Sequence, residues 1–308
     1  MITKTAINEY LELYNEPLEI LIDISSKLTS QNFNNKINFC SLISAKTGKC
    51  SQNCKYCAQS SHYNTSIKTH PLIDCDTVKK AAISAKENGA TRFAVVTSGK
   101  LPSQNELFEI AKMIETINKT GLKSCASLGI MPLKDLMILK SAGLSRFHHN
   151  INTCKSYHSE ICSTHTYQDR IDTVNASREA GLEVCCGVII GMGESKQQRL
   201  EMALELSEIA PDSIPINILD PIKGTPFENY GNKIDEEEIL KTIAIFRIIM
   251  PNISLRFAGG RIKRLSEKAQ KQGLIAGIDS MIVGNLLTTI GQEAQNDLKM
   301  IEECGKSL

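Results

Sequence analysis

One pattern recurs along the chain: an amphipathic helical segment ends in Gly, and a short apolar strand follows at once. The glycines are Gly89, Gly121, Gly143 and Gly181, and the strands after them read ATRFAVV, LKSCASLG, LSRFHHNI and LEVCCGVIIG. Gly favours such helix ends because it accepts a positive φ. The strands are rich in Val, Ile, Leu and Phe, as is typical of parallel strands buried on both faces. The pattern therefore predicts repeated β/α units.

Further strands complete the series. One is expected near Asn38–Ala45, and DSIPINIL, NISLRFAGG and GIDSMIVG are expected in the C-terminal half, with helices near Glu201–Ile209, Asp235–Ile249 and Lys263–Gln272. Eight alternating β/α units in 308 residues predict an α/β fold, a (βα)8 barrel of the TIM type. The alternative is an open doubly wound sheet, which usually has fewer strands and a phosphate-binding loop.

No linker or low-complexity segment divides the chain, so we expect one domain over residues 1–308. Residues 1–36 are expected to form helices packed against one end of the barrel, residues 37–290 the barrel, and residues 291–308 a C-terminal tail. The N-terminus lacks the basic start and apolar run of a secretory signal, and no segment approaches the roughly 20 apolar residues that span a bilayer. A cytoplasmic protein without a membrane partner is therefore predicted.

Charge and cysteine content narrow the function. Because 35 basic and 34 acidic side chains balance to a net charge of +1, no nucleic-acid partner is expected. Eleven cysteines are many for a cytoplasmic chain, and cytosolic thiols stay reduced. Metal binding or catalysis therefore explains them better than a disulfide framework. Four cysteines without partners at ligand spacing are expected to be small buried hydrophobes: Cys75, Cys154, Cys162 and Cys304.

The strongest motif is Cys50-Ser-Gln-Asn-Cys54-Lys-Tyr-Cys57, in a loop expected after the first strand. Three thiolates at this spacing can hold three corners of a 4Fe–4S cluster and leave the fourth iron open to a substrate. Zinc is the alternative. Structural zinc normally takes four protein ligands in paired spacings, and His62 is then the candidate for the fourth.

The strands also carry polar and thiol side chains where a barrel interior normally holds Val, Ile and Leu. These residues are Cys125, His148, Asn150, Cys185, Asn217 and Arg256. Any one of them could be a satisfied core residue, but buried polar groups cost free energy unless they are paired. Several of them on different strands predict a ligand inside the barrel.

A CxxxCxxC loop after the first strand of a βα barrel resembles the radical S-adenosylmethionine (SAM) enzymes. The resemblance implies that SAM binds the open iron and that one electron from the cluster cleaves it to methionine and a 5′-deoxyadenosyl radical. Tyr56 matches the aromatic residue that precedes the third cysteine. Gly191, in the segment VIIGMGE, resembles the glycine-rich motif where the backbone approaches SAM.

From about Asn38 to Thr289 the chain resembles the biotin synthases. The strings that carry this resemblance are SAKTGKCSQNCKYCAQSSHY, CASLG, HHNINT, THTYQDRIDT, VCCGVIIGMGE, SIPINIL, KGTPF, LRFAGGR and NLLTT. The resemblance implies sulfur insertion into dethiobiotin in two radical steps, with a sulfide of an auxiliary iron–sulfur cluster as the sulfur donor. It also implies a homodimer and an external electron donor of the flavodoxin or ferredoxin type.

In biotin synthases the auxiliary cluster is a 2Fe–2S cluster deep in the barrel, held by three cysteines and an arginine. Cys125, Cys185 and Arg256 match three of these ligands and imply catalytic roles for them, but Ala94 stands where the remaining cysteine is expected. Cys40 on the first strand is the predicted replacement, because strand alternation turns Cys186 away. The rearranged set could hold a larger cluster than 2Fe–2S. The alternative is that Cys40 is a plain buried thiol.

Other matches concern SAM and the substrate. Asn150 and Asn217 match positions that contact SAM or the ureido ring of the substrate, and Arg170 matches an arginine that contacts SAM. Thr288 and Thr289 match residues near the carboxylate tail of the substrate.

Two positions depart from the family pattern. His148 replaces a usual asparagine in the substrate region, and Asn152 replaces an aspartate that binds the SAM ribose. An amide can still hydrogen-bond a hydroxyl, so Asn152 remains a predicted SAM contact.

Two other functions stay open. A related radical SAM enzyme of the hydrogenase-maturation or methylornithine-synthase type would share the barrel and the first cluster, but need not keep Cys125, Cys185 and Arg256 together. A non-catalytic iron–sulfur electron carrier is the more distant alternative. The polar barrel interior and the SAM motif speak against it.

Overall fold

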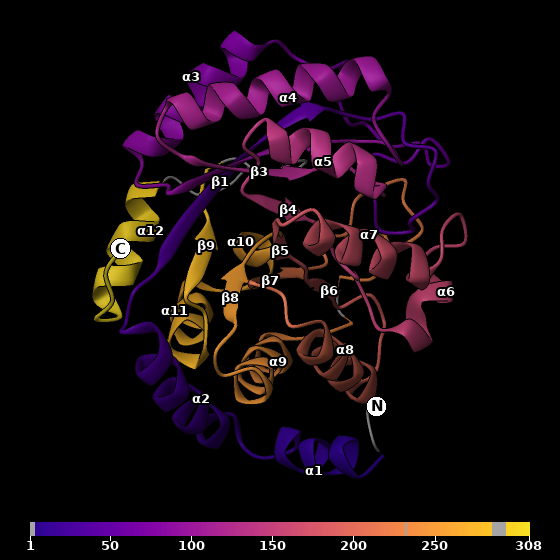
Figure 1. The fold of residues 1–308 in the computed structure, drawn as a ribbon. Helices are drawn as coiled ribbons and strands as arrows, with labels where there is room; N and C mark the ends of the chain where they lie inside the picture. Colours follow the sequence, from indigo (N-terminus) through magenta and orange to yellow (C-terminus); the bar gives the residue numbers. More distant parts are fainter. Residues whose placement is uncertain (1–3, 232, 285–293) are drawn as a thin grey trace.

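The computed structural model describes residues 4–231, 233–284 and 294–308, which form a parallel barrel surrounded by helices (Figure 1). The strands are β1 (Asn38–Lys46), β2 (Arg92–Thr97), β3 (Lys123–Ser127), β4 (Arg146–His148), β5 (Glu183–Cys185), β6 (Val188–Ile190), β7 (Ser213–Ile218), β8 (Ser254–Phe257) and β9 (Ser280–Ile282). Neighbouring strands run in the order β5-β4-β3-β2-β1-β9-β8-β7-β6, and pairing of β5 with β7 closes the ring. The predicted (βα)8 barrel is confirmed.

The predicted fifth strand is split into β5 and β6. Between them, the N–H of Gly187 donates to Oδ1 of Asn150 at 2.8 Å instead of to a neighbouring strand. A Cβ atom on Gly187 would lie 2.0 Å from the carbonyl oxygen of Pro215, so only glycine permits this close approach. The two short strands therefore share one position of the barrel, which keeps eight positions in the ring.

Helices follow the strands on the outside of the ring. The longer ones are α3 (Cys75–Glu87), α4 (Gln104–Lys119), α5 (Leu133–Ser141), α7 (Tyr167–Glu179), α8 (Lys196–Ile209), α9 (Glu236–Ile249) and α11 (Glu267–Ala276). The shorter ones are η1 (Lys155–Tyr157), α6 (His158–Ile161) and α10 (Arg261–Arg264). The glycines of the repeated pattern all have positive φ, as predicted: Gly89, Gly121, Gly143 and Gly181.

The single helix expected over Lys263–Gln272 is two helices, α10 and α11. The break occurs because Ser266 caps a new helix, its hydroxyl accepting from the N–H of Ala269 at 3.2 Å.

The N-terminal helices α1 (Lys4–Tyr14) and α2 (Leu18–Phe33) lie along the outside of α8, α9 and α11 (Figure 1). The hydroxyl of Tyr14 is 2.6 Å from that of Thr242, and Nε of Arg199 donates to Tyr14 at 3.0 Å. Their predicted position against one end of the barrel was therefore wrong. They form a second layer outside the helix ring, because Tyr14 finds its polar partners on α8 and α9.

The C-terminal segment contains the helix α12 (Ala294–Glu303), which packs against α11. A buried ion pair of 2.6 Å joins Arg261 to Asp297, and the N–H of Ile37 donates to the carbonyl of Ser307 at 2.7 Å. These two contacts hold the C-terminal segment beside the start of β1. Among the described helices, none is long and apolar enough to cross a membrane.

Candidate active site

A cavity of about 400 Å³ runs from the loop after β1 into the interior of the barrel. Most of the predicted site residues line it: Cys40, Cys50, Cys54, Tyr56, Cys57, Cys125, His148, Asn150, Asn152, Arg170, Cys185, Asn217 and Arg256. The mouth lies at the carboxyl ends of the strands, where βα barrels place their active sites. Thr288 and Thr289 lie outside the described residues.

Backbone hydrogen bonds fix the loop after β1, whose three cysteines line the cavity. The N–H of Cys57 donates to the carbonyl of Cys54 at 3.0 Å, and the N–H of Cys50 donates to the carbonyl of Gln59 at 2.9 Å. His62, the candidate fourth zinc ligand, is exposed, and its ring bonds the carbonyl of Ser51 at 3.0 Å. The loop therefore offers three thiols and not a complete zinc site with His62.

Ionising Cys54 or Cys57 without a cation is unfavourable. Burial, with a smaller contribution from the neighbouring Cys50, raises the pKa of Cys57 to about 11. A side-chain hydrogen bond with Cys162, followed by burial, holds the pKa of Cys54 well above its usual range. Three thiolates would also repel one another. The donor set therefore fits a cationic iron–sulfur cluster with one open position.

Deeper in the barrel, Cys185 lies between a histidine nitrogen and a guanidinium nitrogen. Nδ1 of His148 is 3.2 Å from its sulfur, and Nη1 of Arg256 donates to it at 3.7 Å. Burial opposes ionisation of Cys185, but the charges of His148 and Arg256 outweigh it and lower its pKa to about 7. Nε of Arg256 donates to the hydroxyl of Ser280 at 2.9 Å, which fixes the guanidinium. Cys185 is thus placed in an environment that favours a thiolate.

Cys40 on β1 and Cys125 on β3 both line the barrel interior, one on each side of β2. Ala94 lies opposite Leu42 on one side and opposite Cys125 on the other, so only a methyl group stands on the intervening strand β2. A hydrogen bond from Cys125 lowers the pKa of Cys40 to about 6, against its burial, and the same bond raises the pKa of Cys125 well above its usual range. The interaction therefore favours a thiolate at Cys40, the form in which a cysteine binds iron.

Cys186 has the opposite orientation from Cys185. It is fully buried in the main hydrophobic core and is not among the residues that line the cavity. Burial raises its pKa to about 12. The predicted alternation, which turns this thiol away from the barrel interior, agrees with this position.

A connected polar group lies beside the three-cysteine loop. Thr166 and Asp169 form a capping box that begins α7 and sets Arg170 toward the cavity. Nη1 of Arg170 donates to the carbonyl of Asn150 at 2.9 Å. The amide oxygen of Asn152 faces Arg170 and Tyr56. It accepts from Nη2 of Arg170 at 3.0 Å and from the hydroxyl of Tyr56 at 2.6 Å. Four of the predicted SAM contacts are therefore in one network.

Backbone groups hold the amides of the other predicted contacts. Oδ1 of Asn217 accepts from Gly259 at 2.9 Å, and its Nδ2 donates to the carbonyl of Val188 at 3.0 Å. Gly191 is not among the residues lining the cavity. A Cβ atom there would meet Ile234 at 2.7 Å, so the close approach that requires glycine is to Ile234. The approach of Gly191 to SAM stays a prediction.

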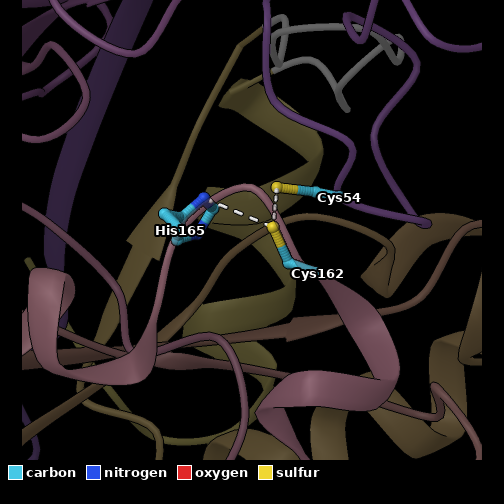
Figure 2. Close-up of side chains that lie close together, drawn as sticks. All are labelled: Cys54, Cys162 and His165. Carbon is cyan, nitrogen blue, oxygen red and sulfur yellow. Dashed lines mark hydrogen bonds between the residues drawn. The ribbon is translucent and has the colours of Figure 1, made fainter.

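Cys162 was wrongly expected to lack partners. Its sulfur lies 3.8 Å from that of Cys54 and 3.3 Å from Nδ1 of His165 (Figure 2). Cys54 is 108 residues away in sequence, so no local pattern predicts that contact. The Cys-x-x-His spacing to His165 was the available signal.

His149 is a further cavity residue that alternation does not predict. It follows the last residue of β4, where the alternation of inward and outward side chains no longer holds. Its Nε2 has no hydrogen-bond partner among the described residues.

The barrel and its three-cysteine loop define a class of enzyme. The model of the Radical SAM superfamily matches residues 45–206, and that of the Biotin and Thiamin Synthesis associated domain matches residues 215–307. The site is therefore that of a radical SAM enzyme, which implies a 4Fe–4S cluster and SAM.

Relatives identify the family within this class. The biotin synthase of Acetivibrio thermocellus is 50% identical over 288 residues, which are 93% of this chain and 89% of that protein. The chain belongs to the biotin synthase family of radical SAM sulfurtransferases.

Solved structures of other enzymes share the fold. Methylornithine synthase superposes with a TM-score of 0.83 at 16% identity, over 100% of this chain and 94% of that one. The FeFe-hydrogenase maturase HydG from Carboxydothermus hydrogenoformans gives 0.81 at 17% identity, over 95% of this chain and 72% of that one. At such identities the likeness shows the fold alone, whereas the sequence relatives favour biotin synthesis over these two activities.

Proposed function

We propose that this chain converts dethiobiotin to biotin with two iron–sulfur clusters, one bound by Cys50, Cys54 and Cys57 and the other deeper in the barrel. The observation that carries the proposal is that one cavity joins the three-cysteine loop to Cys40, Cys125, Cys185 and Arg256. A substrate bound between the two sets would face SAM on one side and the sulfur donor on the other.

The first cluster, when bound, supplies the electron that cleaves SAM to methionine and a 5′-deoxyadenosyl radical. The network of Tyr56, Asn152 and Arg170 would orient the polar groups of SAM beside the loop. Asn150 and Asn217 are assigned to SAM or to the ureido ring of dethiobiotin, and backbone hydrogen bonds hold both amides in place. Thr288 and Thr289 are assigned to the carboxylate tail. The enclosed interior would keep water from the reacting carbons.

The second set is proposed as Cys40, Cys125, Cys185 and Arg256. His148 and Arg256 favour a thiolate at Cys185, and the Cys40–Cys125 hydrogen bond favours one at Cys40. Cys40 thus supplies the thiolate that Ala94 cannot. We propose that the altered set holds an auxiliary cluster, of the 2Fe–2S type or larger, as the sulfur donor.

The remaining assignments follow the family. We propose a single domain over residues 1–308, a homodimer, an external electron donor of the flavodoxin or ferredoxin type, and a cytoplasmic location. The parallel barrel, which carries residues matched by both family models, supports the single domain.

Dethiobiotin should stimulate SAM cleavage. After anaerobic reconstitution and reduction, we expect 5′-deoxyadenosine to form about tenfold faster with dethiobiotin than without it, a difference of about 1.4 kcal/mol in the barrier. The physical reason is that a substrate filling the cavity offers the radical a carbon–hydrogen bond. Removal of that hydrogen makes the cleavage of SAM irreversible. Chromatography of the nucleoside product measures the rate, and free amino acids serve as the control. Stimulation by an amino acid and none by dethiobiotin would instead favour a related radical SAM activity.

A further inference from the structure

Cys162 lies beside the cluster-binding loop but has no part in the site described so far. It follows α6, on a different segment of the chain from Cys54, and the two sulfur atoms face each other 3.8 Å apart (Figure 2). Both side chains are buried. His165, three residues further along, places Nδ1 at 3.3 Å from the sulfur of Cys162. The three side chains therefore need a common explanation.

A metal ion held by all three is the first possibility. Two thiolates on one tetrahedral zinc ion, each about 2.3 Å from the metal, would be about 3.8 Å apart, so the sulfur spacing alone allows it. The proton on His165 argues against it. Nη2 of Arg170 is 2.7 Å from Nε2 of His165, and a guanidinium can only donate. Nε2 must then accept, which leaves the proton on Nδ1, the atom that faces Cys162 and that a metal would need.

The three side chains instead form a directed chain of hydrogen bonds. Arg170 donates to His165, and protonated Nδ1 of His165 faces the sulfur of Cys162 at 3.3 Å and Oε1 of Gln52 at 2.9 Å. In the chain without a cluster, Cys54 can donate to Cys162. Once Cys54 binds iron it is a thiolate without a proton, so the donor can then only be Cys162.

The thiol proton of Cys162 has two competing acceptors. Oγ1 of Thr164 is 3.5 Å from its sulfur, but that oxygen already accepts from the N–H of Asn53 at 3.0 Å. Oδ1 of Asn53 is 3.3 Å from its sulfur, but that oxygen already accepts from the N–H groups of Ser163 and Thr164, at 3.0 and 3.2 Å, and from the Thr164 hydroxyl at 3.1 Å. A negatively charged thiolate is a stronger acceptor than an amide oxygen that is already occupied.

We propose that Cys162 is a positioning residue that donates an S–H···S hydrogen bond to the Cys54 sulfur of the bound cluster. Through His165 it also connects that sulfur to Arg170, a proposed SAM contact. Reduction adds negative charge to the cluster, and a donor to its sulfur stabilises that charge, which raises the reduction potential. Cys162 therefore makes it easier to load the electron that cleaves SAM. This inference rests on the proposed function, because it requires the cluster.

The test is a redox titration of anaerobically reconstituted protein, followed by electron paramagnetic resonance. The signal that changes when SAM is added identifies the cluster of the loop, and iron counting establishes loading. In Cys162→Ala we expect reduction to become about tenfold less favourable, a shift of about 59 mV to more negative potential. Cys162→Ser keeps a donor and should restore most of the shift. Cys154→Ala is the matched control, because its buried sulfur pairs with Ser156 at 3.2 Å and should leave the potential unchanged.

An unchanged potential in fully loaded Cys162→Ala would overturn the proposal, and so would a Ser variant that shifts as far as the Ala variant. If the Ala variant loads iron poorly, Cys162→Val, which fills the space without a donor, takes its place in the same titration. Failure of the proposed function looks different. In that case the wild-type chain itself would bind no cluster that responds to SAM.

Discussion

Changing Cys54 to Ala is expected to abolish SAM cleavage. With two thiolates left in the loop, the cluster loses one of its three protein ligands, and the iron that should face SAM is no longer fixed. We expect 5′-deoxyadenosine formation by reduced protein to fall by a factor of about 1,000 or more, or about 4.1 kcal/mol. Cys50→Ala and Cys57→Ala should behave alike, because all three sulfurs line the same end of the cavity.

The matched control is Cys75→Ala. Cys75 is a half-buried thiol at the start of α3 and is not among the residues lining the cavity. It should keep full SAM cleavage and full iron. Thermal unfolding of the Cys54 variant should stay close to that of the wild type, because the loop lies outside the main hydrophobic core. Undiminished deoxyadenosine production by Cys54→Ala would contradict the assignment of the loop.

Changing Cys40 to Ser is expected to remove auxiliary iron and biotin formation while SAM cleavage continues. A hydroxyl is a poor substitute for a thiolate ligand of iron, and Ala94 offers no replacement on the next strand. Iron and sulfide counting with Mössbauer spectroscopy measures the loss and also reports the type of auxiliary cluster. Mass spectrometry of biotin measures the activity.

Cys186→Ser is the control for this variant. Cys186 lies in the core, on the side of the strand away from the cavity, so its replacement should leave auxiliary iron and biotin yield nearly unchanged. The buried hydroxyl would cost stability instead, about 1–3 kcal/mol. A Cys40→Ser protein with full auxiliary iron and a normal yield of biotin would show that Cys40 is a plain buried thiol.

Most of the fold could be predicted because its signals are local. A helix that ends at Gly143 and a strand that starts at once need only neighbouring residues to be recognised, and the eight barrel positions follow from repeats of that kind. The break at Gly187 depends on the side chain of Asn150 and the backbone of Pro215, both distant in sequence. The outside position of α1 likewise depends on Tyr14 meeting Thr242, which no local pattern indicates.

The candidate site likewise contains some residues that a local sequence pattern predicts and others that only the folded chain brings together. The three loop cysteines are visible because their spacing lies within eight residues of sequence. The role of Cys40 was predicted from the absence of a cysteine at Ala94, and Cys40 does line the same cavity as Cys125, but its binding to a cluster stays a prediction. Cys162 was missed because its role depends on a sulfur 108 residues away, which only the folded chain brings near.

The central claim is that the chain makes biotin from dethiobiotin with sulfur from its own auxiliary cluster. The most direct measurement is a single-turnover reaction of protein reconstituted with isotopically heavy sulfide, with unlabelled sulfide added to the reaction buffer. Mass spectrometry of the product then reports the source of the sulfur. The account predicts biotin that carries the heavy isotope, in an amount limited by the auxiliary cluster. Deoxyadenosine without biotin, or biotin that carries only unlabelled sulfur, would contradict it.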